Sequence, residues 1–153
     1  METDQQGDPR IQERHWQAVP TIAAEKDGAT IYMAWNAGGR DEGMGNYITL
    51  SVSDDLGESW KHDVMVIYPK EPRTCRLFDP VLWRGEDDKI YLKFTVTMSD
   101  YGDQIDPMSS AHQMELSWKG DHIEHTEPEF LAYGLMMNPP TSVKGKGITL
   151  YPL

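Results

Sequence analysis

A repeat of about 60 residues constrains this chain more than any other feature. Pro20, Pro80 and Pro140 stand 60 residues apart. Each proline is followed by a short apolar segment, a polar turn and a second apolar segment, which is the pattern of a β-hairpin. A fixed period of this length indicates propeller blades, a solenoid or another array of stacked units. It exceeds the roughly 40 to 50 residues of a four-stranded blade, and the excess fits one enlarged loop in each repeat.

The apolar segments predict an antiparallel meander in each of the first two repeats. Helical periodicity is absent from the sequence, so the predicted class is all-β. The expected strands are about Val19–Ala24, Thr30–Asn36, Tyr47–Ser53 and Trp60–Tyr68, then Val81–Trp83, Lys89–Val96, Ala111–Trp118 and His122–Leu131. We expect residues 1–13 to be disordered or loosely attached, and residues 14–153 to form one domain. Its units are a first repeat at about 14–70, a second at about 71–132 and the first hairpin of a third at about 133–153.

Charge and composition exclude several classes of partner. The chain has 25 acidic and 14 basic residues, and its net charge of −11 argues against a nucleic-acid backbone as ligand. The apolar segments are strand-sized, so we expect no membrane span. The N-terminal residues are polar rather than signal-like, and the single Cys75 cannot form an internal disulfide, so neither feature assigns a cellular compartment. Asp100, Asp103 and Asp106 do not have the spacing of a calcium loop, and we predict no metal and no cofactor.

The octapeptide from Ser53 to Trp60 fits the pattern Ser-x-Asp-x-Gly-x-x-Trp, with Ser53, Asp55, Gly57 and Trp60 at its fixed positions. Asp55 can accept hydrogen bonds from backbone N–H groups of the turn, Gly57 can adopt positive φ, and Trp60 can anchor the returning strand. We therefore expect a structural turn here. In a meander, this third turn lies on the rim opposite the long connections.

The long connections and the opening strand carry the candidate site residues, because loops on a rigid scaffold are where binding and catalytic groups tend to lie. Asp41 or Glu42 is the candidate general acid or base. The candidate substrate-binding residues are His15, Trp16, Gln17, Arg40, Arg76, Asp79 and Asn138. Among them, Trp16 can stack on a sugar ring, and the arginines can bind an acidic or hydroxyl group.

The octapeptide resembles the Asp box, which closes hairpins in the blades of sialidase-like propellers. Further stretches are also similar to bacterial proteins of this group, namely His15–Ala23, Asn46–Tyr47, Asp79–Trp83 and Met136–Thr141. The chain thus resembles the N-terminal portion of a sialidase-like Asp-box (BNR repeat) β-propeller. About two and a half four-stranded blades are present, too few to close a ring of four to eight. We expect either part of a longer propeller or a ring closed by self-association.

The resemblance also bears on activity. Family sialidases are six-bladed hydrolases in which three arginines clasp the carboxylate of sialic acid, an aspartate is the acid/base, and a tyrosine assisted by a glutamate is the nucleophile. The first arginine belongs to an Arg-Ile-Pro motif that reads Ala18-Val19-Pro20 here, which argues against sialidase activity. The family's acid/base falls in the Asp41–Glu42 region, and a further pocket aspartate falls near Asp79.

Three functions follow. The leading one is a glycoside hydrolase of the sialidase superfamily, or part of one, that acts on a glycan with Asp41 or Glu42 as acid/base. A neutral sugar as substrate would explain the missing arginine, since a pair of carboxyl groups suffices for its hydrolysis. A propeller polysaccharide lyase would use His15 or a tyrosine as base, and Arg40 or Arg76 to neutralise a uronate. The third is a non-catalytic glycan-binding or interaction propeller.

Overall fold

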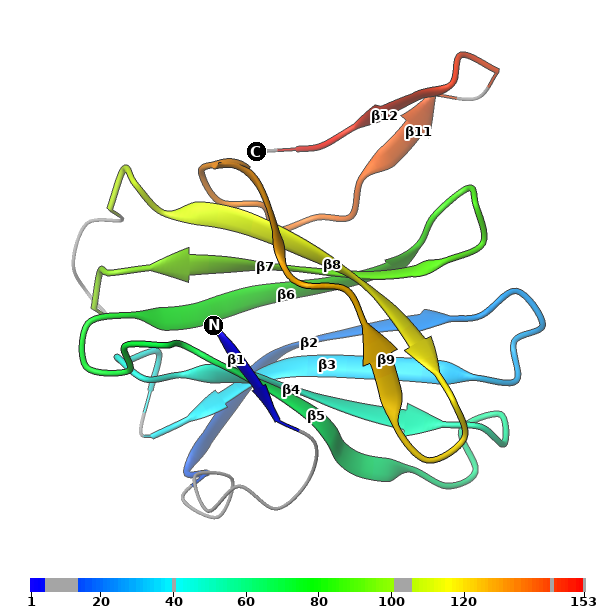
Figure 1. Ribbon diagram of the computed structural model, residues 1–153, viewed down its shortest axis with the longest axis horizontal. Coiled ribbons are helices and arrows are strands. Elements are labelled where there is room, and N and C mark those ends of the chain that lie inside the picture. The colour runs from blue at the N-terminus through cyan, green and yellow to red at the C-terminus, as the bar shows by residue number, and fades with distance from the viewer. Residues whose placement is uncertain (5–13, 40, 101–105, 144, 153) are drawn as a thin grey trace.

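The computed structural model describes residues 1–4, 14–39, 41–100, 106–143 and 145–152 (Figure 1). Within these ranges the chain forms twelve strands and no helix. The strands make antiparallel sheets, none of them closed. The all-β class predicted from the sequence is therefore confirmed.

The first sheet is built from the first repeat and has the order β1-β5-β4-β3-β2. Its strands are β1 (Glu2–Asp4), β2 (Trp16–Ala24), β3 (Ile31–Gly38), β4 (Tyr47–Ser53) and β5 (Lys61–Tyr68). The last four form the predicted meander, with β2 beginning three residues earlier than expected. We expected residues 1–13 to be disordered or loosely attached, but β1 within this segment pairs antiparallel with β5. Residues 5–13 lie outside the described ranges.

The second sheet is built from the second repeat and has the order β10-β8-β7-β6, with β9 also paired to β8. Its strands are β6 (Arg76–Arg84), β7 (Ile90–Thr97), β8 (Ser110–Trp118), β9 (Ile123–His125) and β10 (Glu129–Tyr133). The single strand expected over His122–Leu131 is two short strands. Pro128, which has no N–H to donate to a ladder, lies in the break between them. A separate hairpin of β11 (Thr141–Val143) and β12 (Ile148–Leu150) follows.

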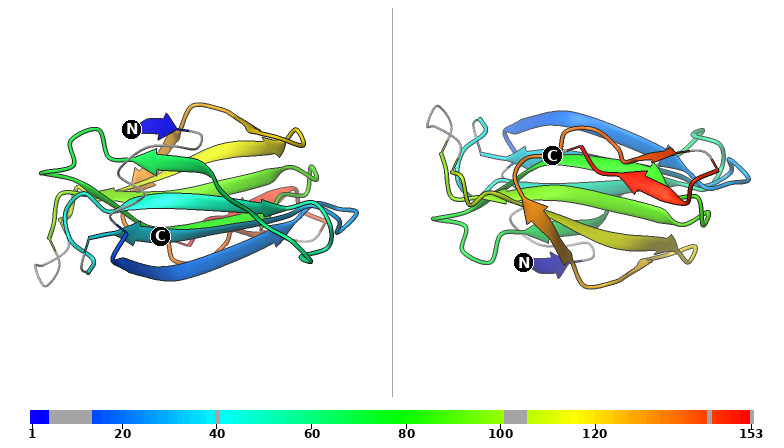
Figure 2. Two further views of the ribbon diagram at one scale, coloured as in Figure 1. Left: turned by 90° about the horizontal axis from the view of Figure 1, so that it is seen from below. Right: turned by 90° about the horizontal axis from the view of Figure 1, so that it is seen from above.

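The sheets are stacked in the order of the repeats. Figure 1 views them from the side, with the first sheet at the bottom, the second in the middle and the β11–β12 hairpin at the top. Figure 2 views the same stack from below, where the first sheet is nearest, and from above, where the hairpin is nearest. The backbone N–H of Leu82 on β6 donates to Oγ1 of Thr21 on β2 at 3.0 Å, which ties the first strands of the two repeats together.

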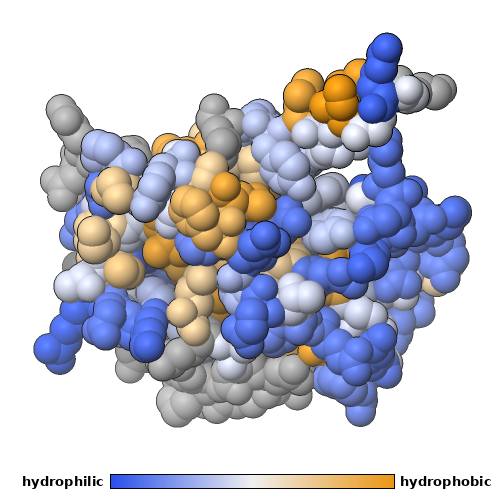
Figure 3. Space-filling view, turned by 45° about the horizontal axis from the view of Figure 1, so that its top comes forward, coloured by the Kyte–Doolittle hydropathy of each residue, from blue (hydrophilic) through white to orange (hydrophobic). Residues whose placement is uncertain are grey.

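The core lies between the two larger sheets. It consists of buried apolar side chains, at alternate positions in β3, β4, β7 and β8, as expected where each strand has one face against a neighbouring sheet. They are Tyr32, Ala34, Ile48, Leu50, Val52, Val64, Met65 and Ile67 from the first sheet, and Leu77, Leu82, Ile90, Leu92, Phe94, Met114, Leu116 and Ile123 from the second. The hairpin contrasts with this core. Val143, Ile148 and Leu150 remain substantially exposed, and Figure 3 shows apolar side chains gathered on its surface.

Candidate functional site

Arg76 joins two long connections on one rim of the stack. Its Nε donates to the backbone oxygen of Ser99 at 2.8 Å, and its Nη1 donates to the backbone oxygen of Glu42 at 2.6 Å. The carboxylate Oε2 of Glu42 lies 3.5 Å from the same Nη1. The Arg76 side chain is buried, and its guanidinium lies 4.8 Å from the centroid of the Phe78 ring. Two residues that the sequence placed in different repeats therefore meet here.

Asp79 sits on a β-bulge inside β6. The register between β6 and β7 shifts between Phe78 and Val81, and Asp79 has a φ of 49°. The same irregularity occurs in β2, where Val19 precedes Pro20 with a φ of 53°. Positive φ costs a non-glycine residue about 1–2 kcal/mol, so both repeats hold a strained backbone at the residue before the proline. Bulges re-aim side chains near functional sites, and in the second repeat the re-aimed side chain is a carboxylate.

The environment of Asp79 favours its protonated form. Only 8% of the residue is exposed, and this burial raises the pKa of its carboxyl group. The nearby Glu42 carboxylate raises that pKa further, while the charges of Lys93 and Arg76 oppose the shift. The carboxyl group of Asp79 thus holds its proton to higher pH than an exposed aspartate does.

Lys93 is a residue of this cluster that the sequence analysis missed. It lies in the middle of β7 and is completely buried. Burial lowers the pKa of its ammonium group to about 8, against the opposing effect of the Asp79 charge. The sequence did contain a signal: a lysine interrupts an otherwise apolar strand segment, at the position that Ala34 holds in the first repeat.

Two other candidates, Asp41 and Trp16, belong to the first sheet and its β3–β4 connection. Asp41 is exposed, and its backbone oxygen accepts a hydrogen bond from Nδ2 of the buried Asn46 at 2.6 Å. Trp16 pairs with Gly38, at the base of the connection that carries Asp41 and Glu42. It is half-buried.

The remaining candidates are more peripheral. His15 is exposed, and its backbone N–H donates to the oxygen of Gly38 at 2.9 Å. The Oε1 of the exposed Gln17 accepts a hydrogen bond from Trp35 Nε1 at 2.7 Å. Asn138 is exposed in the link between β10 and β11. Arg40 lies outside the described residues.

The octapeptide forms a polar turn between β4 and β5, at the opposite end of β4 from Glu42. Ser53 Oγ donates to Asp55 Oδ1 at 2.7 Å and accepts the N–H of Gly57 at 2.9 Å. The carboxylate of Asp55 accepts the backbone N–H of Ser59 at 2.8 Å and its hydroxyl at 2.6 Å. The hydrogen bonds from Ser59 and Ser53 lower the pKa of Asp55 to about 2. Gly57 has a φ of 88°, and Trp60 lies half-buried just before β5.

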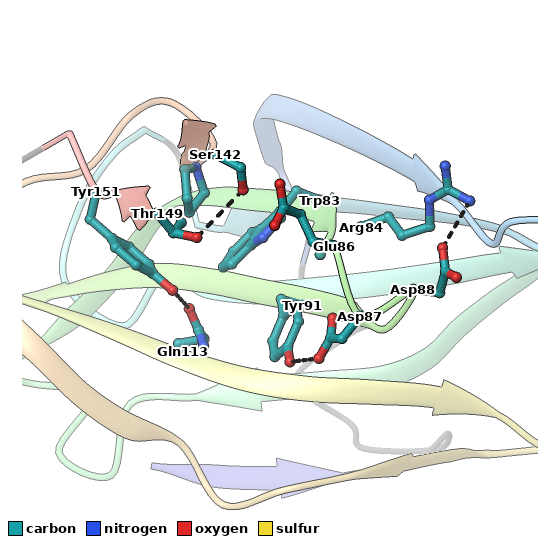
Figure 4. A pocket seen from close by; sticks show the side chains of 12 residues that line it. Trp83, Arg84, Glu86, Asp87, Asp88, Tyr91, Gln113, Ser142, Thr149 and Tyr151 are labelled. Atoms are coloured by element: carbon teal, nitrogen blue, oxygen red, sulfur yellow. Dashed lines mark hydrogen bonds and ion pairs between the residues drawn. The ribbon is translucent and has the colours of Figure 1, made fainter. Parts of the chain in front are cut away.

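A cavity of about 630 Å³ lies away from this cluster, between the second sheet and the β11–β12 hairpin (Figure 4). The rings of Trp83 and Tyr91 stack with centroids 5.3 Å apart, and Tyr151 meets Trp83 edge-on at 6.5 Å. Tyr91 corresponds in the repeat to Tyr32, whose hydroxyl contacts the next sheet. The cavity therefore occupies the place where one repeat packs on the next, and its lining contains none of the candidate residues from the sequence.

Two features are absent from the described residues. No group of three or more histidine, cysteine, aspartate and glutamate side chains in these ranges is arranged to hold a metal ion. The same ranges contain no helix long and apolar enough to cross a membrane.

The cluster of Glu42, Arg76, Asp79 and Lys93 therefore combines two carboxyl groups with two cations. Carboxyl groups and cations of this kind can transfer protons and bind hydroxyl groups. Comparison of the sequence with models of known protein families and with curated proteins finds no match.

Proposed function

We propose that this chain forms part of a sialidase-type β-propeller that acts on glycans, and that it hydrolyses glycosidic bonds of neutral sugars. The observation that carries this proposal is that the Glu42 carboxylate lies 3.5 Å from Arg76 Nη1 and that its charge raises the pKa of the buried Asp79. Glycoside hydrolysis needs one carboxyl group that donates a proton and a second that is ionised. Burial and the Glu42 charge keep the proton on Asp79 to higher pH, while Arg76 places a positive charge beside Glu42. Asp79 is accordingly the proposed acid, and Glu42 the proposed base or nucleophile.

Two features favour a neutral substrate. Ala18 stands where family sialidases carry the first arginine of their carboxylate clasp. The net charge of −11 repels anionic ligands at long range.

Glu42 is preferred over Asp41 as the second carboxyl group, because Glu42 contacts Arg76 and acts electrostatically on Asp79.

The stacking of the repeats supports the propeller. Two antiparallel sheets, each built from one repeat, pack face to face with a hydrogen bond between their strands β2 and β6, and a hairpin of the third repeat lies over the second sheet. A ring needs four to eight blades, so the proposal requires more blades from additional chain or from self-association. Light scattering on the purified protein measures its mass and tests the self-associated form.

The catalytic proposal is tested with a panel of neutral aryl glycosides. We expect turnover by the wild-type protein, a loss of about 10²- to 10⁴-fold in kcat for Glu42→Gln and Asp79→Asn, and little change for Asp41→Asn. Circular dichroism confirms that the variants fold. Retention of full activity by both Glu42→Gln and Asp79→Asn would refute the assignment.

A second candidate is a glycan-binding propeller without catalysis, which the small exposed fraction of Asp79 favours. Retention of glycans on an array, with no product released from any bound glycan, would favour this alternative. The polysaccharide lyase is a weaker candidate, because it needs an arginine that is free to neutralise a uronate. Arg76 is buried and bonded to the backbone oxygens of Ser99 and Glu42.

A further inference from the structure

The ammonium group of Lys93 is buried in the second sheet. Lysine is rarely buried completely unless it is paired. Among the described residues, Nζ of Lys93 has no hydrogen-bond partner, and neither has the buried hydroxyl of Thr95 on the same strand. An unpaired ammonium group in an apolar interior is costly, so a nearby negative charge is needed to stabilise its protonated form.

The register of β6 and β7 supplies that charge. Val81 pairs with Lys93, and Phe78 pairs with Thr95. The bulge that contains Asp79 is inserted between these two pairs, so it faces the segment of β7 from Lys93 to Thr95. The charge of Lys93 lowers the pKa of Asp79, and the charge of Asp79 raises the pKa of Lys93.

The other charged groups that act on Asp79 are Glu42 and Arg76. Glu42 lies on the connection between β3 and β4 and opposes ionisation of Asp79. Arg76 lies on β6, but its guanidinium is bonded to the backbone oxygens of Ser99 and Glu42. Lys93 therefore remains as the cation that has Asp79 as its counter-charge and has no hydrogen bond to another described group.

We propose that Lys93 is a positioning residue that controls the protonation of Asp79 by acting as its buried counter-charge. This role rests on the proposed function, in which Asp79 is the acid. With Lys93 protonated, the ionised form of Asp79 is stabilised after it has given up its proton. Without the ammonium charge, Asp79 holds its proton more tightly and is a weaker acid.

The test follows the side-chain carboxyl carbon of Asp79 by NMR as a function of pH, which requires no substrate. The signal is assigned by its absence from Asp79→Asn. In Lys93→Met, which removes the charge and leaves an unbranched side chain one atom shorter, we expect the pKa of Asp79 to rise by about 1–3 units. In Lys93→Arg, which keeps the charge, we expect most of this rise to disappear. An unchanged titration of Asp79 in a folded Lys93→Met variant would overturn the proposal.

A reciprocal measurement covers the case in which Lys93→Met does not fold. The NMR signal of the Lys93 Cε, the carbon bonded to the ammonium nitrogen, is followed as a function of pH in the wild-type protein and in Asp79→Asn. Removal of the counter-charge is expected to lower the pKa of Lys93, and an unchanged value would also overturn the proposal. If the protein hydrolyses glycosides, the alkaline limb of its kcat/KM profile should move to higher pH in Lys93→Met. Absence of glycosidase activity refutes the proposed function but leaves both titrations interpretable.

Discussion

The hydroxyl of Tyr32 accepts a hydrogen bond from the backbone N–H of Trp118 at 2.8 Å, which joins β3 of the first sheet to the end of β8 in the second. The same hydroxyl donates to Glu25 Oε1 at 2.7 Å. The side chain of Trp118 makes two further contacts with the first sheet. Its indole N–H donates to Asp54 at 3.2 Å, and the ammonium group of Lys61 lies 5.2 Å from the centroid of the indole ring. The end of the first repeat that holds the Ser53–Trp60 turn is therefore attached to the second repeat, with Trp118 contacting Tyr32, Asp54 and Lys61.

Replacement of Tyr32 by phenylalanine is expected to destabilise the packing of the two sheets. It leaves the backbone N–H of Trp118 without its partner, and the cost of one unsatisfied polar group is about 1–3 kcal/mol. Urea unfolding measures the change. Tyr91→Phe is the matched control from the second repeat, because its hydroxyl bonds to the exposed Asp87. Equal destabilisation by the two substitutions would contradict the inter-sheet role of Tyr32.

Protonation of Asp55 is expected to loosen the turn between β4 and β5 in acid. The folded-state pKa of about 2 is below the value of about 3.9 for an unperturbed aspartate. The stabilisation by this carboxylate is therefore complete above about pH 4 and is lost as the pH falls towards 2. NMR titration of Asp55, together with hydrogen exchange of the Ser59 amide, measures both effects. A midpoint for Asp55 near pH 4 would contradict the prediction.

Relief of backbone strain at Val19 is expected to stabilise the protein. Val19 has a φ of 53° and is partly exposed, and positive φ is unfavourable for a β-branched residue, whereas asparagine tolerates it. We expect Val19→Asn to raise the free energy of unfolding by about 1 kcal/mol. Val19→Thr is the control, since threonine is also β-branched and keeps the strain. Thermal unfolding compares them, and equal stability of the two variants would show that the strain is not being relieved.

The buried lysine predicts a gain of stability in mild alkali. The pKa of Lys93 is about 8 in the folded protein and about 10.4 in an unfolded chain. Between these values the unfolded chain binds more protons, so the free energy of unfolding rises with pH. The charged group that acts on Lys93 is Asp79. Asp79 is in turn influenced by the charges of Glu42 and Arg76.

Comparison with Lys93→Met isolates this contribution. The difference in unfolding free energy between the wild-type protein and Lys93→Met is expected to shift in favour of the wild type from pH 8 to about 10.4. Urea denaturation at several pH values measures it. A difference that stays constant over this range would mean that Lys93 has an ordinary pKa in the folded protein.

Most of the strands were predicted correctly because their signals are local. Alternating apolar residues and polar turns indicated the meanders, and β4 was predicted with its observed limits. The prediction began this strand at Val81, whereas β6 begins at Arg76. The reason is that the dipeptide Asp79-Pro80 is typical of a turn rather than of a strand interior. In the structure, the strand continues through this dipeptide as a bulge. Whether an Asp-Pro pair ends a strand or bulges within it depends on the neighbouring strand, which a local pattern does not contain.

The candidate site was predicted only in part. The long connections indicated Glu42, Arg76 and Asp79 as separate candidates, because loops and charged residues can be identified from local sequence. Their convergence depends on how the sheets stack. Lys93 was missed because a single lysine within a strand is ordinarily read as an exposed residue.

The sequence by itself determined the period of 60 residues, the hairpins and the polar turn from Ser53 to Trp60, since each depends on residues within one repeat. Only the tertiary structure decided that Arg76 bonds to Glu42, and that Asp79 and Lys93 act on each other. The physical reason is burial. Desolvation and nearby charge set the protonation of Asp79 and Lys93, and both arise only when the second sheet packs against its neighbours.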